Sequence, residues 1–325
     1  MAQLLTSELI SLGAEARRKH PEIKQATDAV LAQLKSELDA FLASSRNDHS
    51  PPSDHALLRP VLLSCETKLP KVISLAMALL QRILLQKLVP DQAVPTIVAT
   101  LNKLLTPPSR SDVDVQLKIL QIASALLTSY ATLHNADLSN TLMLGFKLHE
   151  GSKVAVVSST AAATLRQSVM AVFDKVKEED NVLNGIKGGG EEAAALAPLA
   201  AMSVDLPDGS VTLFPSSRDA YLVFSDLCSL ANAEPATFLS LNSLSKTFSL
   251  ELIESVLSNH HRLFASSPGP RTQSSSHPEL LFLLRVKVCP LLIKSLSEPP
   301  AFPVYLRLMR LLFLLLRQFS SDLIL

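Results

Sequence analysis

The residues that could carry out chemistry are few and scattered along the chain. Cys65, Cys228 and Cys289 lie inside apolar helical patterns, and none has a histidine at a spacing that would activate its thiol as a nucleophile. Buried, reduced thiols in a cytosolic protein are the simpler interpretation. His260 and His261 are neighbours, so on a helix their side chains point about 100° apart, and no further ligand stands at metal-binding spacing. We expect this pair to form a polar helix end.

A glycine run and three other histidines are the remaining candidates for catalysis. The run Lys187-Gly188-Gly189-Gly190 lacks both the Lys-Ser/Thr pair and the preceding apolar strand of a phosphate-binding loop. It is typical of a linker. His20, His134 and His149 stand at expected helix ends, where solvated or capping histidines are commoner than general bases. The sequence therefore predicts a protein that is not an enzyme and holds no metal or other cofactor.

One cluster supports a functional hypothesis. Arg17, Arg18, Lys19 and His20 follow the first expected helix and directly precede Pro21. Cations at an exposed corner can meet anionic lipid headgroups or an acidic partner. The simpler alternative is that they complement the negative end of the first helix dipole, because the cluster is small. The chain has 30 basic and 30 acidic residues, and this balance argues against nucleic acid as a partner.

Helices must position these residues, because apolar residues recur at intervals of three and four along most of the chain. The pattern is clear in residues 23–41, 73–84, 115–126, 154–176 and 244–264. The expected first-turn prolines and helix N-caps are Pro21, Pro70, Asp91, Ser111 and Asn135. No sustained alternation between hairpin turns is present, so a sheet is not expected. Helix pairs spaced roughly 40 to 50 residues apart predict an all-α, elongated armadillo- or HEAT-like solenoid.

Changes in composition predict the domain boundaries. Residues 179–210 contain acidic residues, a glycine run and an alanine-rich stretch, which predicts a flexible linker. We expect a helical domain in 1–178 and a second in 211–325, interrupted by a polar loop at 266–277. The apolar runs Leu280–Leu296 and Pro303–Phe319 contain charged residues, which favours buried helices over membrane spans. The last run continues to Leu325 without a helix stop, which predicts a truncated second domain whose apolar face meets helices absent from this chain or a partner.

Several short stretches of the sequence resemble stretches of one known protein family. In the first segment they are Leu9–Leu12, Arg17–Lys19, Ser64–Lys68, Phe146–His149 and Thr160–Gln167; in the second they are Arg218–Phe224, Asp226–Cys228, Lys246–Leu257 and His277–Glu279. With these strings, nearly the whole chain resembles the N-terminal region of the Golgi Mon-type (yeast Ysl-type) proteins, relatives of the large Arf guanine-nucleotide exchange factors. The first segment resembles their dimerisation and cyclophilin-binding domain. The second resembles the start of the homology domain upstream of the exchange domain (HUS-type), without its acidic box.

The resemblance implies a non-catalytic scaffold or regulatory module in vesicle traffic between Golgi and endosomes, because the Mon-type relatives lack the exchange domain. It implies an Arf or Arf-like small GTPase, a Dopey-type protein and a phospholipid flippase as partners, and a homodimer as a further state. It also implies a cytoplasmic location, peripheral on trans-Golgi network and endosome membranes. The alternative is the autoregulatory N-terminal region of a true large Arf exchange factor, and a third hypothesis is an enzyme whose active site spans the helical stack.

Overall fold

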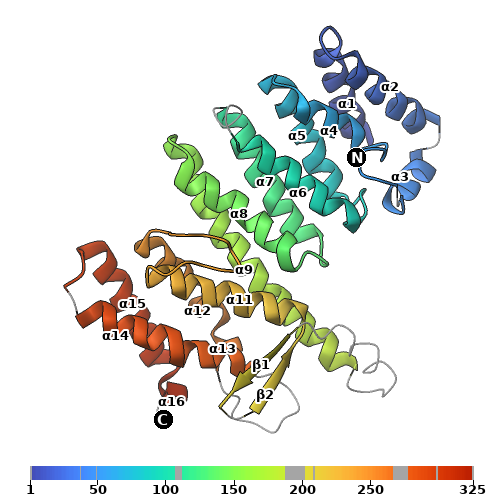
Figure 1. The fold of residues 1–325 in the computed structure, drawn as a ribbon. Coiled ribbons are helices and arrows are strands. Elements are labelled where there is room, and N and C mark those ends of the chain that lie inside the picture. Colours follow the sequence, from blue (N-terminus) through green and yellow to red (C-terminus); the bar gives the residue numbers. More distant parts are fainter. Residues whose placement is uncertain are drawn as a thin grey trace. The chain divides into compact units, whose positions relative to one another are not determined.

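The structure, a computed structural model, describes residues 2–36, 38–48, 50–106, 112–186, 202–207, 209–265, 277–297 and 299–323. Most of these residues are helical (Figure 1), which confirms the predicted helical class. The chain forms two compact units. Unit 1 comprises Met1–Leu133 and Asn140–Leu165, and unit 2 comprises His134–Ser139 and Arg166–Leu325. The division between Leu165 and Arg166 falls within a helix.

Unit 1 is a set of helices packed around an aliphatic core. Its elements are α1 (Ala2–Ala16), α2 (Pro21–Ser36), α3 (Leu38–Arg46), α4 (Arg59–Glu66), α5 (Pro70–Leu85), the 3-10 turn η1 (Asp91–Ala93), α6 (Val94–Leu104), α7 (Val113–Ser129), most of α8 (Asn135–Gly151) and the start of α9 (Ala155–Ile186). Helix α5 contacts α1, α4 and α7. It buries Val72, Ile73, Ala76, Met77, Leu79, Leu80, Ile83 and Leu84. Removing this apolar surface from water makes α5 the main hydrophobic support of the unit.

Two glycines allow helices of unit 1 to approach closely. A Cβ on Gly13 of α1 would lie 2.5 Å from Oγ1 of Thr27 on α2. A Cβ on Gly145 of α8 would lie 2.8 Å from Cδ2 of Leu165 on α9. Packed atoms do not approach so closely, so a side chain at either position would force the facing side chain or its helix to shift.

The predicted helix starts are partly confirmed. Pro21 and Pro70 each begin a helix, as their fixed backbone angle favours. Asp91 is instead the first residue of η1, and its carboxylate accepts a hydrogen bond from Thr132. Ser111 lies outside the described residues, and the N-cap of α7 is Asp112, whose Oδ1 accepts from the Val115 amide at 3.1 Å.

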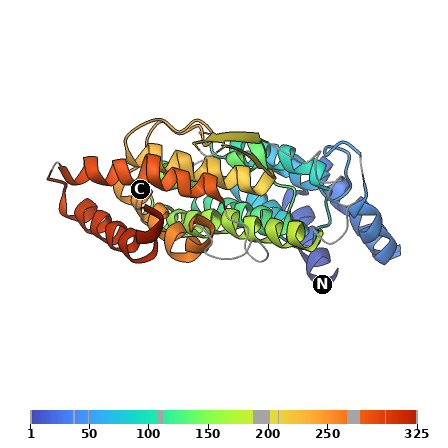
Figure 2. The same ribbon diagram turned by 90° about the horizontal axis from the view of Figure 1, so that it is seen from below.

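Unit 2 contains the rest of α9 and the C-terminal elements. These are β1 (Met202–Leu206), β2 (Gly209–Leu213), α11 (Pro215–Ala231), α12 (Lys246–Phe264), α13 (Pro278–Leu283), the π-helical turn η4 (Leu284–Val288), α14 (Cys289–Ser297), α15 (Phe302–Gln318) and α16 (Ser320–Leu323). Helix α12 packs against α11 and α15, and α14 lies beside α15 (Figures 1 and 2). The π turn precedes Pro290, whose ring and missing N–H interrupt regular helix pairing. Among the described residues, none of the helices is both long enough and apolar enough to cross a membrane.

A β-hairpin corrects the prediction that the fold has no sheet. Strands β1 and β2 pair antiparallel, with Val204 opposite Val211. Met202, Val204 and Leu206 are half-buried and alternate with exposed residues, the period-two pattern of a strand. The pattern was overlooked because it is only five residues long and lies within the presumed linker.

The first part of that presumed linker is also ordered. Residues 179–186 continue α9, and residues 202–206 form β1. The prediction that all of residues 179–210 are flexible is therefore wrong for these two stretches. The glycine run at 188–190, with the remainder of 187–201, lies outside the described residues, as does 266–276 of the predicted polar loop.

Two helices end in left-handed backbone without a glycine. Lys87, after α5, has φ 49°, and Ala233, after α11, has φ 61°. In both places the amide three residues after the last helical residue donates to the carbonyl five residues earlier, Leu88 to Ile83 at 3.1 Å and Glu234 to Ser229 at 2.8 Å. This is the Schellman arrangement, in which glycine is the favoured residue because a Cβ is strained there.

We expect Ala233→Gly to stabilise the protein by about 0.5–1 kcal/mol, because the relief of strain exceeds the added entropy of the unfolded chain. Chemical denaturation measures the change. The matched control is Ala32→Gly at an exposed site within α2, which should destabilise by about 0.5–1 kcal/mol. Destabilisation by both substitutions would contradict the assigned role of Ala233.

Candidate functional site

Two of the three cysteines are buried, as the sequence predicts. Cys65 and Cys228 are free and buried, and Cys289 is half-buried. Burial raises the pKa of both Cys65 and Cys228 to about 12. A thiol with such a pKa is almost fully protonated at neutral pH and is a poor nucleophile.

His260 is not the solvated helix-end residue that the sequence predicts. It sits at a kink in α12, is only 3% exposed, and its Nε2 lies 2.9 Å from Oδ1 of Asp174 on α9. Its ring packs 5.6 Å from that of Phe173, which also contacts Phe224 and Phe264. Burial lowers the pKa of His260 despite the Asp174 hydrogen bond, so the ring stays neutral at pH 7. Neither His260 nor His261 belongs to a group of three metal-ligating side chains in the described part of the chain.

The predicted basic cluster forms the turn between α1 and α2. Arg17, Arg18 and Lys19 are exposed there, and the amides of Lys19 and His20 donate to the Ala16 carbonyl. We call these four residues, 17–20, the basic turn. His20 differs from the other three because its Nδ1 lies 3.0 Å from the Glu22 carboxylate. The turn therefore presents three exposed cations beyond the end of α1.

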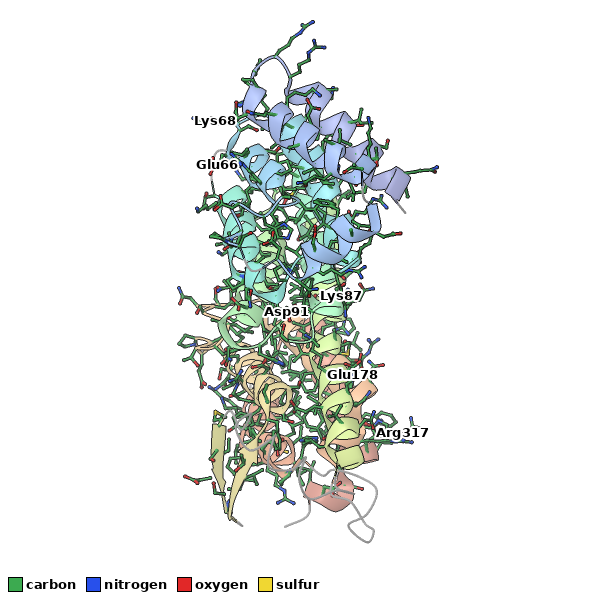
Figure 3. The ribbon with its side chains drawn as sticks, turned by 90° about the vertical axis from the view of Figure 1, so that its right-hand side faces the viewer. Glu66, Lys68, Lys87, Asp91, Glu178 and Arg317 are labelled. Atoms are coloured by element: carbon green, nitrogen blue, oxygen red, sulfur yellow. The ribbon has the colours of Figure 1, made fainter. Side chains whose placement is uncertain are left out.

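The structure brings two further cations to the basic turn. Lys71, at the start of α5, forms an ion pair of 2.7 Å with Glu15 at the end of α1. This contact places the turn between α4 and α5 beside the basic turn, and Lys68 is exposed within it (Figure 3). Because Glu15 and the exposed Glu66 offset part of the charge, the surface is moderately and not strongly basic.

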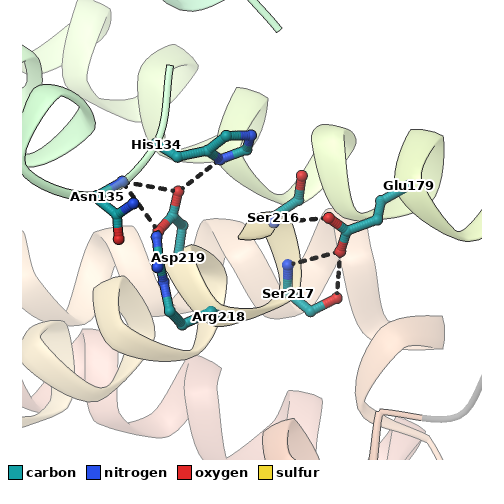
Figure 4. A network of polar contacts seen from close by, with 7 residues as sticks. All are labelled: His134, Asn135, Glu179, Ser216, Ser217, Arg218 and Asp219. Carbon is teal, nitrogen blue, oxygen red and sulfur yellow. Dashed lines mark hydrogen bonds and ion pairs between the residues drawn. The ribbon is translucent and has the colours of Figure 1, made fainter. Parts of the chain in front are cut away.

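Unit 2 contains a network of polar contacts that begins at Asp219 of α11 (Figure 4). Asp219 is only 1% exposed. Its Oδ2 lies 2.8 Å from Nδ1 of His134, and its Oδ1 accepts from the Asn135 amide at 3.3 Å and from Arg218 at 2.5 Å. Asn135 has φ 56° at the start of α8, so Asp219 supplies the capping contact that the sequence assigned to the Asn135 side chain.

A second carboxylate holds the start of α11. Phe214 precedes this helix and provides no side-chain cap. Instead Oε1 of Glu179 accepts from the Ser216 amide at 2.8 Å, and Oε2 accepts from the Ser217 amide at 3.0 Å and its hydroxyl at 2.8 Å (Figure 4). The two amides are among those that no helical carbonyl can satisfy, and the positive end of the helix dipole favours the carboxylate.

His277 forms a third contact to α9. Its Nε2 lies 3.1 Å from Oδ2 of Asp180, and its Nδ1 lies 2.9 Å from Oε1 of Glu279 at the start of α13. Burial opposes a charge on His277, but the hydrogen bonds and charges of both carboxylates outweigh it and raise the pKa to about 9. The residue is therefore an imidazolium at neutral pH.

Together, Asp174, Glu179 and Asp180 are the α9 carboxylates, and each binds a different element: α12, α11 and the start of α13. An ion-pair chain adds to them, since Arg166 of α9 binds Glu251 of α12, and Arg307 of α15 binds Glu251 and Glu254 at 2.9 Å each. Each of these contacts joins one helix to another and so holds the helices of unit 2 in place.

We expect Glu179→Ala to destabilise unit 2 by about 1–2 kcal/mol, because the Ser216 and Ser217 amides lose their acceptor. Glu178→Ala is the matched control, since Glu178 is the adjacent and exposed carboxylate of α9. Its cost should stay below about 0.5 kcal/mol. Equal losses from the two substitutions in urea denaturation would show that the contact of Glu179 contributes nothing specific.

His277 predicts a pH-dependent stability. The folded-state pKa lies above the ordinary value of 6.5, so the stabilisation is complete below pH 6.5 and is lost as pH rises towards 9. The loss is on the order of 3 kcal/mol. Unfolding free energies of the natural protein and His277→Gln should therefore converge between pH 6 and pH 9.5. A difference that is independent of pH would contradict the charged state of His277.

Comparison with known proteins identifies two domains. Residues 1–180 match the Mon2/Sec7/BIG1-like dimerisation and cyclophilin-binding (DCB) domain, and residues 216–325 match the Mon2/Sec7/BIG1-like HUS domain. The α9 carboxylates thus belong to the DCB segment, whereas Ser216, Ser217 and His277 belong to the HUS segment.

Individual relatives agree with this result. The chain is 31% identical over 342 residues to the Protein MON2 homolog of Homo sapiens, covering 98% of the chain and 18% of that relative. It is 30% identical over 320 residues to the Protein MON2 homolog of Schizosaccharomyces pombe and 27% identical over 327 residues to Protein MON2 of Saccharomyces cerevisiae. Each match covers 98% of the chain but only 17% and 18% of those two relatives. The chain therefore belongs to the Mon2/Sec7/BIG1-like family and carries the DCB and HUS domains of a Mon2 homologue.

Proposed function

We propose that this chain is a non-catalytic scaffold and regulatory module in vesicle traffic between Golgi and endosomes. The observation that carries the proposal is the succession of a DCB domain in 1–180 and a HUS domain in 216–325, with Mon2 homologues as relatives. The polar contacts of the described residues support it, because they join helices and do not assemble a reacting centre. A scaffold needs stable helices with accessible faces, which is what each unit provides.

The proposed arrangement of these helices is an armadillo-like solenoid, in which successive helix pairs share one core. The packing of α5 between α1, α4 and α7 in unit 1 supports this proposal. The proposed domain organisation is the DCB-type domain, a connecting segment and the beginning of a HUS-type domain. The proposed location is the cytoplasmic side of trans-Golgi network and endosome membranes.

The proposed partners are an Arf or Arf-like GTPase, a Dopey-type protein with a phospholipid flippase, and a second copy of the chain. The description of the DCB domain supports dimerisation directly. The other partners rest on the family alone. A titration of the purified chain against Arf and Arf-like GTPases, each loaded with a GTP analogue or with GDP, tests the GTPase contact. Binding selective for GTP would make the chain an effector module, whereas binding to neither form would remove the GTPase from its partners.

The second candidate function is autoregulation of an attached exchange domain, which the family description also covers because it includes Sec7 and BIG1. The similarity to Mon2 homologues favours the scaffold. A nucleotide-release assay separates the scaffold from an enzyme, since the purified chain should not accelerate release from any Arf. Acceleration by the chain itself would contradict the scaffold proposal.

The basic turn provides the proposed membrane contact. We expect Arg17→Glu with Arg18→Glu to lower binding to phosphatidylserine vesicles, because each cation near an anionic surface contributes about 1 kcal/mol. The melting temperature should not change, since both side chains are exposed. The matched control is Lys35→Glu with Lys103→Glu, which changes charge equally at exposed sites away from the turn. Equal loss of vesicle binding in both variants would show that net charge alone, and not the basic turn, determines the binding.

A further inference from the structure

A small pocket of unit 2 lies between the end of α11 and the segment formed by η4 and α14. One wall includes Ser229, Asn232 and Glu234, and the other includes Lys287 and Lys294. We call it the lysine pocket. Its volume of about 210 Å³ is below the roughly 300–1,000 Å³ of sites for drug-sized ligands, so it fits one small chemical group. Both walls belong to described elements of unit 2.

Two ammonium groups are anchored beside each other in the lysine pocket. Nζ of Lys287 donates to Oγ of Ser229 at 3.0 Å and to the Ser225 carbonyl at 3.4 Å. Nζ of Lys294 donates to Oδ1 of Asn232 at 2.9 Å. Ser229 and Asn232 are three residues apart at the end of α11, a spacing that makes them neighbours. Lys287 itself lies in the π-helical turn η4, a distortion that is frequent at functional sites.

Both ammonium groups keep unused hydrogen-bond donors. An ammonium group has three N–H donors, so Lys287 retains one and Lys294 retains two. Arg307 of the same unit pairs with two carboxylates, whereas neither lysine forms an ion pair with any described residue. The lysine pocket therefore offers donors and positive charge to an anion.

Two carboxylates limit this charge. Glu234 lines the pocket, so two lysines and one carboxylate give the lining a net charge of +1. The Glu234 carboxylate accepts a hydrogen bond from the Asn232 side chain. Asp226 also interacts electrostatically with Lys287, but it is buried, does not line the pocket, and accepts from the Leu239 amide at 2.7 Å. An anion with a single charge gains little from such a site, whereas a dianion gains more.

Apolar side chains complete the lysine pocket. Val286, Pro290 and Leu291 line it next to the two lysines. Burial of an apolar group against them adds to the affinity in proportion to the area removed from water. The pocket therefore suits an anionic head attached to a short apolar group.

We propose that the lysine pocket binds a phosphate monoester. Its oxygens accept from Lys287, Lys294 and the Ser229 hydroxyl, and its organic group lies against Pro290 and Leu291. A phosphate monoester carries a charge of about −1.5 to −2 at pH 7 and three acceptor oxygens, so it matches two ammonium groups better than a carboxylate does. The inference rests on the lysine pocket alone and is independent of the proposed trafficking function.

The test is isothermal titration calorimetry of the whole chain with three small ligands. Phenyl phosphate has the phosphate and an apolar group, inorganic phosphate has only the former, and benzoate has a carboxylate in place of the phosphate. We expect phenyl phosphate to bind at least about fivefold more tightly than either of the others, because only it uses both the ammonium groups and the apolar side chains.

Two variants of the lysine pocket should change this binding in opposite directions. Lys294→Gln removes an exposed ammonium group and should weaken phenyl phosphate binding at least about fivefold. Glu234→Gln removes the opposing charge at an exposed position and should strengthen binding about two- to fivefold. Misfolding cannot produce the gain. The matched control is Lys153→Gln, which removes an exposed lysine of unit 1 and should leave binding unchanged.

Several results would overturn the proposal. Absence of phenyl phosphate binding would show that the lysine pocket does not take this group. Equal binding of benzoate would make it a general anion site, and equal binding of inorganic phosphate would remove the role of the apolar side chains. A loss with Lys153→Gln as large as that with Lys294→Gln would show that the binding depends on overall charge.

Discussion

A carboxylate removed from water is destabilising by several kcal/mol unless hydrogen bonds or an opposite charge replace the lost solvation. Unit 2 is arranged around this constraint. Asp219, Glu179 and Asp180 have low exposure or face packed helices, and each is matched by helix amides, an arginine or an imidazolium. Because the partners lie on different elements, satisfying the charges of Glu179 and Asp180 also determines where α11 and α13 lie against α9. Apolar packing around Phe173 then fills the space between them.

The helices were predictable because their signal is local. Apolar residues three and four positions apart mark one face of a helix wherever they occur, and first-turn prolines such as Pro21 and Pro70 depend only on their own backbone. The hairpin at Met202–Leu213 was missed because its alternation is short and its composition resembles a linker. Two of the predicted N-caps were wrong for a related reason. Asp91 is the first residue of the 3-10 turn η1, and the Asn135 amide at the start of α8 donates to Asp219 of α11.

The polar network could not be predicted from the sequence. Glu179 lies 37 residues before Ser216, and no spacing rule connects them, because the end of α9 and the hairpin lie between the two residues. Acidic residues at 178–180 are typical of solvated linkers, and only burial against a helix start reveals a different role. The basic turn was located correctly from its consecutive cations, but the contribution of Lys68 and Lys71 depends on the packing of α1 against α5. His260 was misplaced because a polar residue near a helix end was assumed to face water.

The contact between Glu179 and the start of α11 has an evolutionary consequence. The carboxylate belongs to the segment that matches the DCB domain, and the two amides and the Ser217 hydroxyl belong to the segment that matches the HUS domain. A lineage that loses Glu179 leaves the Ser216 and Ser217 amides without this acceptor, which weakens the start of α11 unless another acceptor replaces it. The contact thus couples the two segments energetically. A chimaera that joins the first segment of one relative to the second segment of another keeps this stabilisation only where the carboxylate and the helix start that it binds are inherited as a pair.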